Sequence, residues 1–239
     1  IDERLQELAD LAEDENWNYI HTETEHSSPI LYYYFHYTFE RIHEQGKIAY
    51  AEDGQYACFN TGLVTDNQEE IFALFAQNKE PDREPWRFVR FVTGGEFDMT
   101  RFPELPDIAT YFDDPSQLVY DSKLELRVNI AHILGDQRER FPDRFRQLED
   151  HNLRDILAGA IESAKNRVRR NYKTAVPQFY RGNIQLLMPI CLSNPKAADL
   201  ALVAHRFGGF YRAATVITLD MAYNNARQLA RPDADWLQP

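Results

Sequence analysis

The sequence predicts an α+β fold, with an antiparallel sheet of about five to seven strands and helices packed on it. Apolar residues recur at helical spacing in some segments and follow strand-like patterns in others. The predicted strands cluster toward both ends of the chain, with a helical block between them, and this order disfavours a doubly wound parallel sheet. The chain has 239 residues, 44% of them hydrophobic and 13% aromatic, so we expect a single domain spanning residues 1–239.

The first half of the chain is predicted to begin with helices and to continue into a hairpin. In order, the predicted elements are a helix over 2–12, a helix over 29–45, strands over 47–50 and 55–59, a helix that is capped by Asp66 or Asn67 and runs to about residue 77, and a strand over 86–93. Pro29 suits the first turn of the second helix, and Gly46 lies just past its end. Asp53-Gly54 between two apolar runs predicts the hairpin turn, and a loop at 60–62 follows. The inward positions of the third helix are Ile71, Leu74 and Phe75.

The second half is predicted to hold long helices and then a meander of three strands. Its elements are helices over 124–134 and 143–172, strands over 184–192, 199–206 and 213–219, and a helix over 221–230. The long helix is expected to break near Asn152 or Gly159, and Pro177 ends this region. Turn residues separate the strands, which favours antiparallel connections. Asp220 is the expected cap of the last helix, and residues 94–123 are predicted mostly as loop.

Net charge, hydrophobic run length and cysteine content limit the classes of protein to which the chain can belong. The net charge is −12, so attraction of the whole surface to nucleic acid or to an anionic membrane is not expected. No apolar run approaches the roughly 18 residues of a membrane span. Cys58 and Cys191 lie in apolar stretches and are predicted to be small buried residues, which favours a reducing compartment and a cytoplasmic location. The chain begins with Ile1 and not with methionine, so we expect it to be part of a longer protein.

Familiar catalytic motifs are absent from the sequence. It contains no GxGxxG, P-loop, HExxH, GxSxG or paired CxxC motif, which argues against the commonest dinucleotide-binding, P-loop, zincin and α/β-hydrolase activities. A polar stretch contains His21, Glu23, Glu25 and His26. We expect a solvated loop there and no metal site, and the sequence leaves the cofactor open.

Two polar clusters are candidate ligand sites. Asn60 and Thr61 follow a predicted strand, where an amide, a hydroxyl and open backbone can hold a phosphate or a base edge; the alternative is an ordinary turn. Asn224, Asn225 and Arg227 lie where a strand enters a helix, and the N–H groups at such a junction can hold an anion. The alternative for this second cluster is that the amides satisfy buried backbone groups.

Two further clusters are basic. His132 lies near Arg138 and Arg140, so it is a candidate general acid or base beside phosphate-binding arginines, or otherwise a hydrogen-bonded core histidine. Residues 165–173 form a basic run that includes Arg170. This run can bind RNA phosphates, with Tyr172 and Tyr180 available to stack bases; the alternative is a cation-rich helix end.

Several segments resemble an uncharacterised, mostly bacterial domain family. The segments are 44–48, 59–63, 172–177 and 221–227, of which Asn-Thr-Gly-Leu and Ala-Tyr-Asn-Asn-Ala-Arg are the most specific. The resemblance covers roughly residues 30–237. Members of that family occur beside LOTUS-type RNA-binding domains, so the resemblance implies a role in RNA metabolism or defence and implies no catalytic residue.

These observations favour a domain that binds a nucleotide or an RNA end and that can process a phosphate or phosphodiester. In this hypothesis Asn60, Thr61, Asn224 and Arg227 line a pocket, Arg138, Arg140 and Arg170 contact phosphate, and His132 is the acid–base residue. The alternative is a non-catalytic interaction or oligomerisation module. It is motivated by the aromatic run over residues 32–37, which requires deep burial or a covering subunit.

Overall fold

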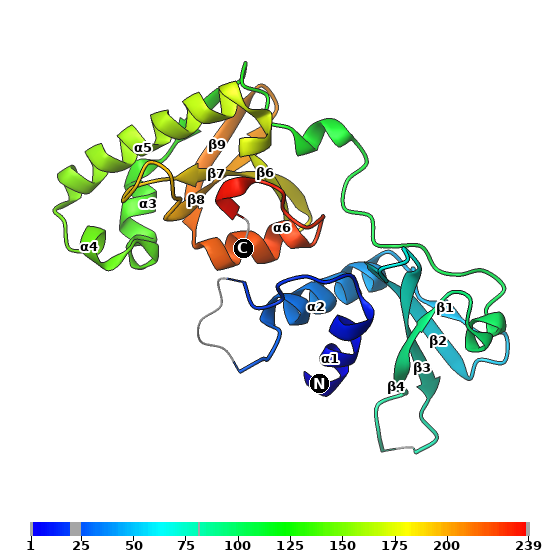
Figure 1. Cartoon of the computed structure of the whole chain (residues 1–239). Coiled ribbons are helices and arrows are strands. Elements are labelled where there is room, and N and C mark those ends of the chain that lie inside the picture. The colour runs from blue at the N-terminus through cyan, green and yellow to red at the C-terminus, as the bar shows by residue number, and fades with distance from the viewer. Residues whose placement is uncertain (1, 20–24, 81, 238–239) are drawn as a thin grey trace. The chain divides into compact units, whose positions relative to one another are not determined.

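The computed structural model describes residues 2–19, 25–80 and 82–237, and it divides the chain into two compact units. Unit 1 comprises residues 1–110, and unit 2 comprises residues 111–239. Each unit has its own sheet, and helices pack on both sheets (Figure 1). The α+β class is therefore confirmed, with the strands divided between a four-stranded and a five-stranded sheet.

Unit 1 is an antiparallel meander with two preceding helices. Its elements are α1 (Asp2–Leu11), α2 (Pro29–Glu44), β1 (Ala49–Tyr50), β2 (Tyr56–Val64), β3 (Glu70–Gln77), β4 (Trp86–Thr93) and the 3₁₀ helix η1 (Phe97–Arg101). The strand order is β1-β2-β3-β4, and every neighbouring pair is antiparallel. The two N-terminal helices and the hairpin around residues 51–55 lie where the sequence predicts them.

Aromatic rings of α2 pack on the sheet of unit 1. The Phe35 ring centroid lies 5.5 Å from that of Phe59 on β2 and 5.9 Å from that of Phe91 on β4. Phe39, one turn further along α2, lies 5.3 Å from Phe59. Tyr34 is buried, and its hydroxyl donates a hydrogen bond to the carbonyl of Thr61. Part of the aromatic run at 32–37 is thus used inside unit 1.

Two predictions for unit 1 are wrong. The segment over 67–77 is strand β3 and not a helix, because Ile71 to Leu74 are buried without interruption, as in a strand covered on both faces. A short apolar run of this kind does not distinguish a buried strand from a helix. The predicted loop at 60–62 lies inside β2, where the pairing with β3 shifts register between Asn60 and Val64.

Unit 2 is built around the five-stranded sheet. Its elements are η2 (Pro115–Leu118), β5 (Glu125–Val128), α3 (Ile130–Asp136), η3 (Arg138–Arg140), α4 (Asp143–Arg146), α5 (Asp150–Arg170), η4 (Tyr172–Thr174), β6 (Val176–Tyr180), β7 (Asn183–Ile190), β8 (Leu200–Phe207), β9 (Phe210–Ile217), α6 (Leu219–Arg227) and η5 (Asp235–Leu237). The strand order is β5-β9-β8-β7-β6. β6 to β9 form an antiparallel meander, and β5 joins its edge parallel to β9.

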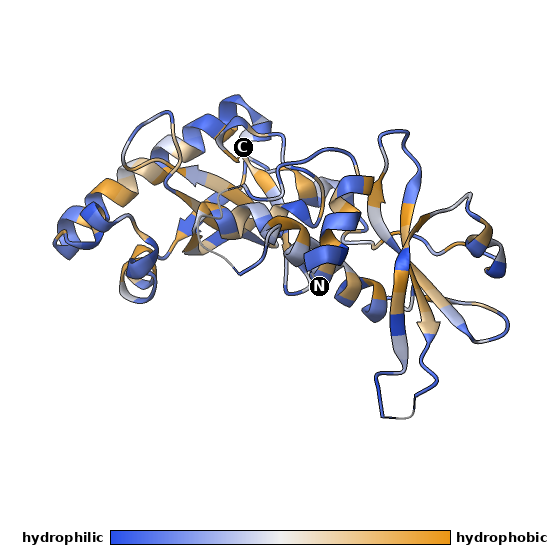
Figure 2. Cartoon of the chain, turned by 60° about the horizontal axis from the view of Figure 1, so that its bottom comes forward, coloured by the Kyte–Doolittle hydropathy of each residue, from blue (hydrophilic) through white to orange (hydrophobic). Residues whose placement is uncertain are grey.

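Helices cover both faces of this sheet. Leu153, Leu157 and Ile161 of α5 form one core with Met188 of β7 and Leu202 of β8. α6 lies on the opposite face, against β6 and β8. Apolar residues are concentrated in helices and strands, whereas the loops are mostly hydrophilic (Figure 2). No helix of the described residues is long and apolar enough to cross a membrane.

The second half also departs from prediction in several places. The helix expected over 124–134 is a strand followed by a helix, because the Asn129 side chain caps α3 by accepting from the N–H of His132. The long helix breaks at residues 147–149, earlier than predicted. Residues 176–180 form strand β6, although Pro177 is expected to end the helical region; an edge strand tolerates proline. The last helix begins one residue before Asp220, after an N-cap at Thr218.

Candidate functional site

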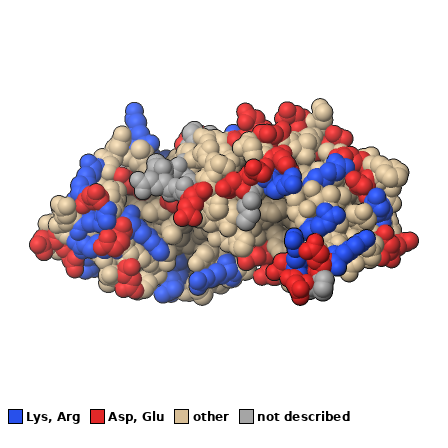
Figure 3. Space-filling view, turned by 90° about the horizontal axis from the view of Figure 1, so that it is seen from below, with Lys and Arg blue, Asp and Glu red and all other residues tan. Residues whose placement is uncertain are grey.

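The two units carry very different charge. Residues 1–110 contain 8 Lys and Arg against 23 Asp and Glu, a formal net charge of −15. Residues 111–239 contain 18 against 15, a net charge of +3. Basic and acidic side chains are interspersed on the face shown in Figure 3. The acidic total therefore does not argue against an anionic ligand in unit 2.

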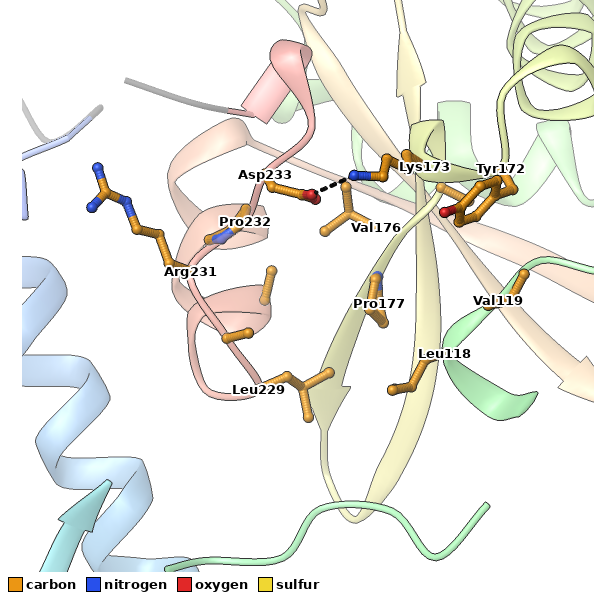
Figure 4. Close-up of a pocket in the computed structure, with 13 residues that line it drawn as sticks. Leu118, Val119, Tyr172, Lys173, Val176, Pro177, Leu229, Arg231, Pro232 and Asp233 are labelled. Atoms are coloured by element: carbon orange, nitrogen blue, oxygen red, sulfur yellow. Dashed lines mark hydrogen bonds and ion pairs between the residues drawn. The ribbon is translucent and has the colours of Figure 1, made fainter. Parts of the chain in front are cut away.

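Unit 2 contains a pocket of about 250 Å³ beside the edge strand β6 (Figure 4). Its lining residues come from the end of η2 and the residue after it, from the stretch that runs from η4 into the start of β6, and from the end of α6 with the chain that follows. They are Leu118, Val119, Tyr172, Lys173, Ala175, Val176, Pro177, Ala226, Leu229, Ala230, Arg231, Pro232 and Asp233. Most of these side chains are apolar, and the volume lies just below the roughly 300–1,000 Å³ of typical ligand pockets.

Polar groups gather on one side of this pocket. Lys173 Nζ lies 3.0 Å from Asp233 Oδ2, and this carboxylate raises the pKa of the lysine. Tyr172 precedes the lysine and is 62% exposed. The segment after α6 is further tied down by Trp236, whose Nε1–H donates to the carbonyl of Thr174 at 2.8 Å. The aromatic ring of Tyr172 and the ammonium group of Lys173 thus lie beside the apolar lining residues of the pocket.

The pair Asn60 and Thr61 is buried in unit 1 and supports the irregular part of β2. Asn60 Oδ1 accepts from the N–H of Gly62 at 2.9 Å, and Asn60 Nδ2 donates to the carbonyl of Pro106 at 3.4 Å. Thr61 Oγ1 donates to the carbonyl of Ile71 at 2.7 Å and accepts from the N–H of Leu63. Both side chains satisfy backbone groups, and their role in ligand binding stays a prediction.

The cluster on α6 belongs to unit 2. Asn224 and Arg227 are buried, and Asn225 is half-buried. Asn225 Nδ2 donates to Gln178 Oε1 of β6 at 3.1 Å, and Gln178 Nε2 donates to Gln185 Oε1 of β7 at 2.7 Å. This chain of amides joins α6 to the sheet. Ala226 lies between these residues and lines the pocket, so the cluster borders the pocket although none of its three residues lines it.

The histidine and arginines of the third cluster lie around α3 and α4. His132 is exposed, and its Nδ1 lies 2.9 Å from Asp136 Oδ2. Arg138 donates to the carbonyls of Arg146 and Leu148 and pairs with Asp150. Arg140 donates to the carbonyl of Val216 on β9 at 2.6 Å. The two arginines thus hold backbone carbonyls, and none of the three predicted residues lines the pocket.

The basic run is the predicted cluster that reaches the pocket. Arg170 is exposed at the last residue of α5, and Tyr172 and Lys173 line the pocket two and three residues later. The other wall, over residues 229–233, was missed. The one sequence feature that points to this wall is Pro232, which follows the last helix. It indicates that the helix ends there, but it does not show which residues the following chain contacts.

The described residues contain no group of three or more His, Cys, Asp and Glu side chains able to hold a metal ion. Of the polar stretch considered above, His21 and Glu23 lie outside the described residues. His26 stacks on Tyr32 with a centroid distance of 3.7 Å. Cys58 is buried, which raises its pKa to about 12, whereas Cys191 is half-buried.

Comparison with known proteins gives one match. No curated protein and no solved structure matches the chain significantly. One family model, whose description is "Domain of unknown function (DUF3825)", matches residues 8–236 and so covers nearly all of both units. The chain therefore belongs to this family of domains of unknown function.

Proposed function

We propose that the chain binds a nucleotide or the end of an RNA chain in the pocket beside β6. The observation that carries the proposal is that Tyr172 and Lys173 adjoin an apolar wall that includes Pro177 and Leu229. Base–aromatic stacking contributes about 1–3 kcal/mol per base. An ammonium group is a point charge suited to phosphate.

Charge in and around the pocket supports an anionic ligand. Lys173 already holds a carboxylate, that of Asp233, at 3.0 Å. Because this pair is exposed, it contributes little to stability, and a phosphate can displace the carboxylate at small cost. Arg170 lies three residues before Lys173 and adds positive charge to the same segment. Turnover of the ligand is not part of the proposal, because His132 is not among the lining residues.

The test is a titration of the full chain with nucleoside monophosphates and with short RNAs that carry or lack a 5′-phosphate. Binding is followed by calorimetry and by thermal shift; a ligand at about 100 times its Kd stabilises the fold by about 2.7 kcal/mol. Tyr172→Ala should weaken binding about 5- to 150-fold, the equivalent of one lost stack. Lys173→Ala should remove the preference for a phosphorylated ligand.

Matched controls come from residues outside the pocket. Lys165 on α5 forms an ion pair with Glu162 at 2.7 Å, so Lys165→Ala removes a similar pair without touching the pocket. Tyr50→Ala is the control for Tyr172→Ala, because Tyr50 is an exposed tyrosine of β1 in unit 1. If Tyr172→Ala and Lys173→Ala bind as these two controls do, or if no nucleotide or RNA end binds, the proposal is wrong.

A further inference from the structure

The five-stranded sheet has a face that α6 covers only in part. Ala204 of β8 and Ala213 of β9 belong to the core beneath α3 and α5, so the residues that alternate with them point to the opposite face. On that opposite face, α6 lies against β6 and touches Gln178 through Asn225. The part over β5, β9 and the end of β8 carries exposed side chains.

Two cross-strand rows occupy this exposed part. In the first, Arg127 of β5 is paired with Arg212 of β9, which is paired with His205 of β8. In the second, Phe210 of β9 is paired with Phe207 of β8. Paired residues project from the same face, so a row of two arginines and a histidine lies beside a pair of phenylalanine rings. We call these five residues the β5–β9–β8 surface.

The rings of this surface form a continuous group. The His205 and Phe207 centroids are 4.6 Å apart, and Phe207 stacks on Phe210 at 6.2 Å with an interplanar angle of 20°. Arg127 Cζ lies 4.1 Å from the Phe210 centroid. Burial, together with the charge of Arg212, lowers the pKa of His205, so its ring is neutral at pH 7.

The two cationic side chains and one of the rings of this surface are accessible. Phe207 is 45% exposed, and Arg127 and Arg212 are also exposed. The one acidic side chain in these rows is Glu125, which pairs with Arg127 at 2.8 Å. Among the described residues Arg212 has no ion-pair partner, so its charge remains available to a phosphate.

We propose that the β5–β9–β8 surface binds single-stranded nucleic acid, with bases stacked on Phe207 and phosphates held by Arg127 and Arg212. Aromatic rings beside arginines on an open sheet bind unpaired bases without needing a particular sequence, because every base has a flat π face. The rings cannot reach the bases of an intact duplex, so the surface should discriminate against double strands. This goes beyond the pocket proposal, because none of the five residues lines the pocket.

The experiment measures fluorescence anisotropy of a 12-residue oligouridylate bound to the full chain. Both ends of the probe are chemically blocked, so that a site for RNA ends cannot contribute. The variants are Phe207→Ala and Arg212→Gln. The matched controls are Phe97→Ala, which removes a more exposed ring of unit 1, and Arg169→Gln, which removes an exposed arginine of α5.

We expect Phe207→Ala to raise Kd about fivefold or more, since one stacking contact is lost. Arg212→Gln should flatten the plot of log affinity against log salt by about 0.7, the value for one phosphate contact on a single strand. Controls should match the wild type, and a duplex of equal length should compete poorly. Tyr172→Ala should leave this Kd unchanged, which separates the outcome from that of the pocket proposal.

Equal Kd values for Phe207→Ala and Phe97→Ala would overturn the proposal, as would equal competition by the duplex. Failure of the wild type to bind the probe, together with self-association that Phe207→Ala abolishes, would show instead that this surface is a protein interface.

Discussion

At the scale of single residues, Gly62 combines a left-handed backbone conformation with a close contact to a neighbouring side chain. Its φ is +73°, in the left-handed region that favours glycine. A Cβ added there would lie 2.6 Å from the hydroxyl oxygen of Tyr34. That hydroxyl donates to the carbonyl of Thr61, the residue before Gly62, so it cannot move away without losing a hydrogen bond.

Gly62→Ala should therefore lower the free energy of unfolding of unit 1 by more than the backbone strain of the alanine accounts for. The strain of a left-handed alanine costs about 1–2 kcal/mol. Displacing the Tyr34 hydroxyl adds about 1 kcal/mol for its hydrogen bond. Urea unfolding followed by tryptophan fluorescence measures the difference, because Trp17 and Trp86 both lie in unit 1.

Gly54→Ala is the matched control for this substitution. Gly54 has a similar φ of +67°, but nothing lies within 4 Å of an added Cβ. In a Tyr34→Phe background, which lacks the obstructing oxygen, Gly62→Ala should cost no more than Gly54→Ala. If the two glycines respond equally in the wild-type background, the close contact with Tyr34 has no energetic consequence.

At the scale of elements, the sequence predicts periodic segments well and buried or short strands poorly. The leucines of α1 and the Pro29 and Gly46 borders of α2 are local signals, and both helices are confirmed. The sequence of β3 also fits a helix, because four consecutive apolar residues are buried on both faces of the sheet and show no strand-like alternation. β6 was missed because its edge position, which accommodates Pro177, depends on pairing with β7 and not on local sequence.

The candidate site shows the same limit. The basic run with Tyr172 was found because a charge cluster is visible in the sequence. The opposite wall was not, since residues 229–233 reach the pocket only through tertiary contacts such as that of Lys173 with Asp233. Arg138 and Arg140 are predicted phosphate ligands, yet their guanidinium groups donate to main-chain carbonyls, and a sequence pattern does not reveal such bonds.

Arg138 fixes the connection between α4 and α5, and we expect its replacement to act on stability. Its guanidinium donates to the carbonyls of Arg146 and Leu148, and a lysine cannot satisfy both in the same geometry. Arg138→Lys should lower the free energy of unfolding by about 2 kcal/mol. The Kd for nucleotides should not change, because Arg138 does not line the pocket.

Arg144→Lys, in the neighbouring short helix α4, is the control. Arg144 is exposed, and its guanidinium lies over the ring of Phe145, so the change should cost about 0.5 kcal/mol or less. Chemical denaturation and ligand titration of both variants give the comparison. A weaker nucleotide Kd for Arg138→Lys at unchanged stability would show that Arg138 is a ligand contact.

At the scale of the whole molecule, the two units exert opposing fields on a polyanion. Unit 1 carries −15 and unit 2 carries +3. The Debye length is about 30 Å at 0.01 M salt and about 8 Å at 0.15 M. At low salt the acidic unit therefore repels a bound nucleic acid. Near physiological salt this repulsion is screened, and the binding energy depends mainly on the side chains in direct contact with the strand.

Removing acidic charge from unit 1 should consequently strengthen nucleic-acid binding only at low salt. Asp66, Glu69 and Glu70 are exposed near the turn between β2 and β3. The triple change to Asn, Gln and Gln should lower the Kd for oligouridylate about threefold at 10 mM salt and leave it unchanged at 150 mM.

The control is a charge-conserving triple variant, Asp66→Glu with Glu69→Asp and Glu70→Asp, whose Kd should match that of the wild type at both salt concentrations. An effect that persists at 150 mM would mean that these carboxylates lie close to the bound strand, and an effect at neither concentration would mean that the acidic unit does not influence binding.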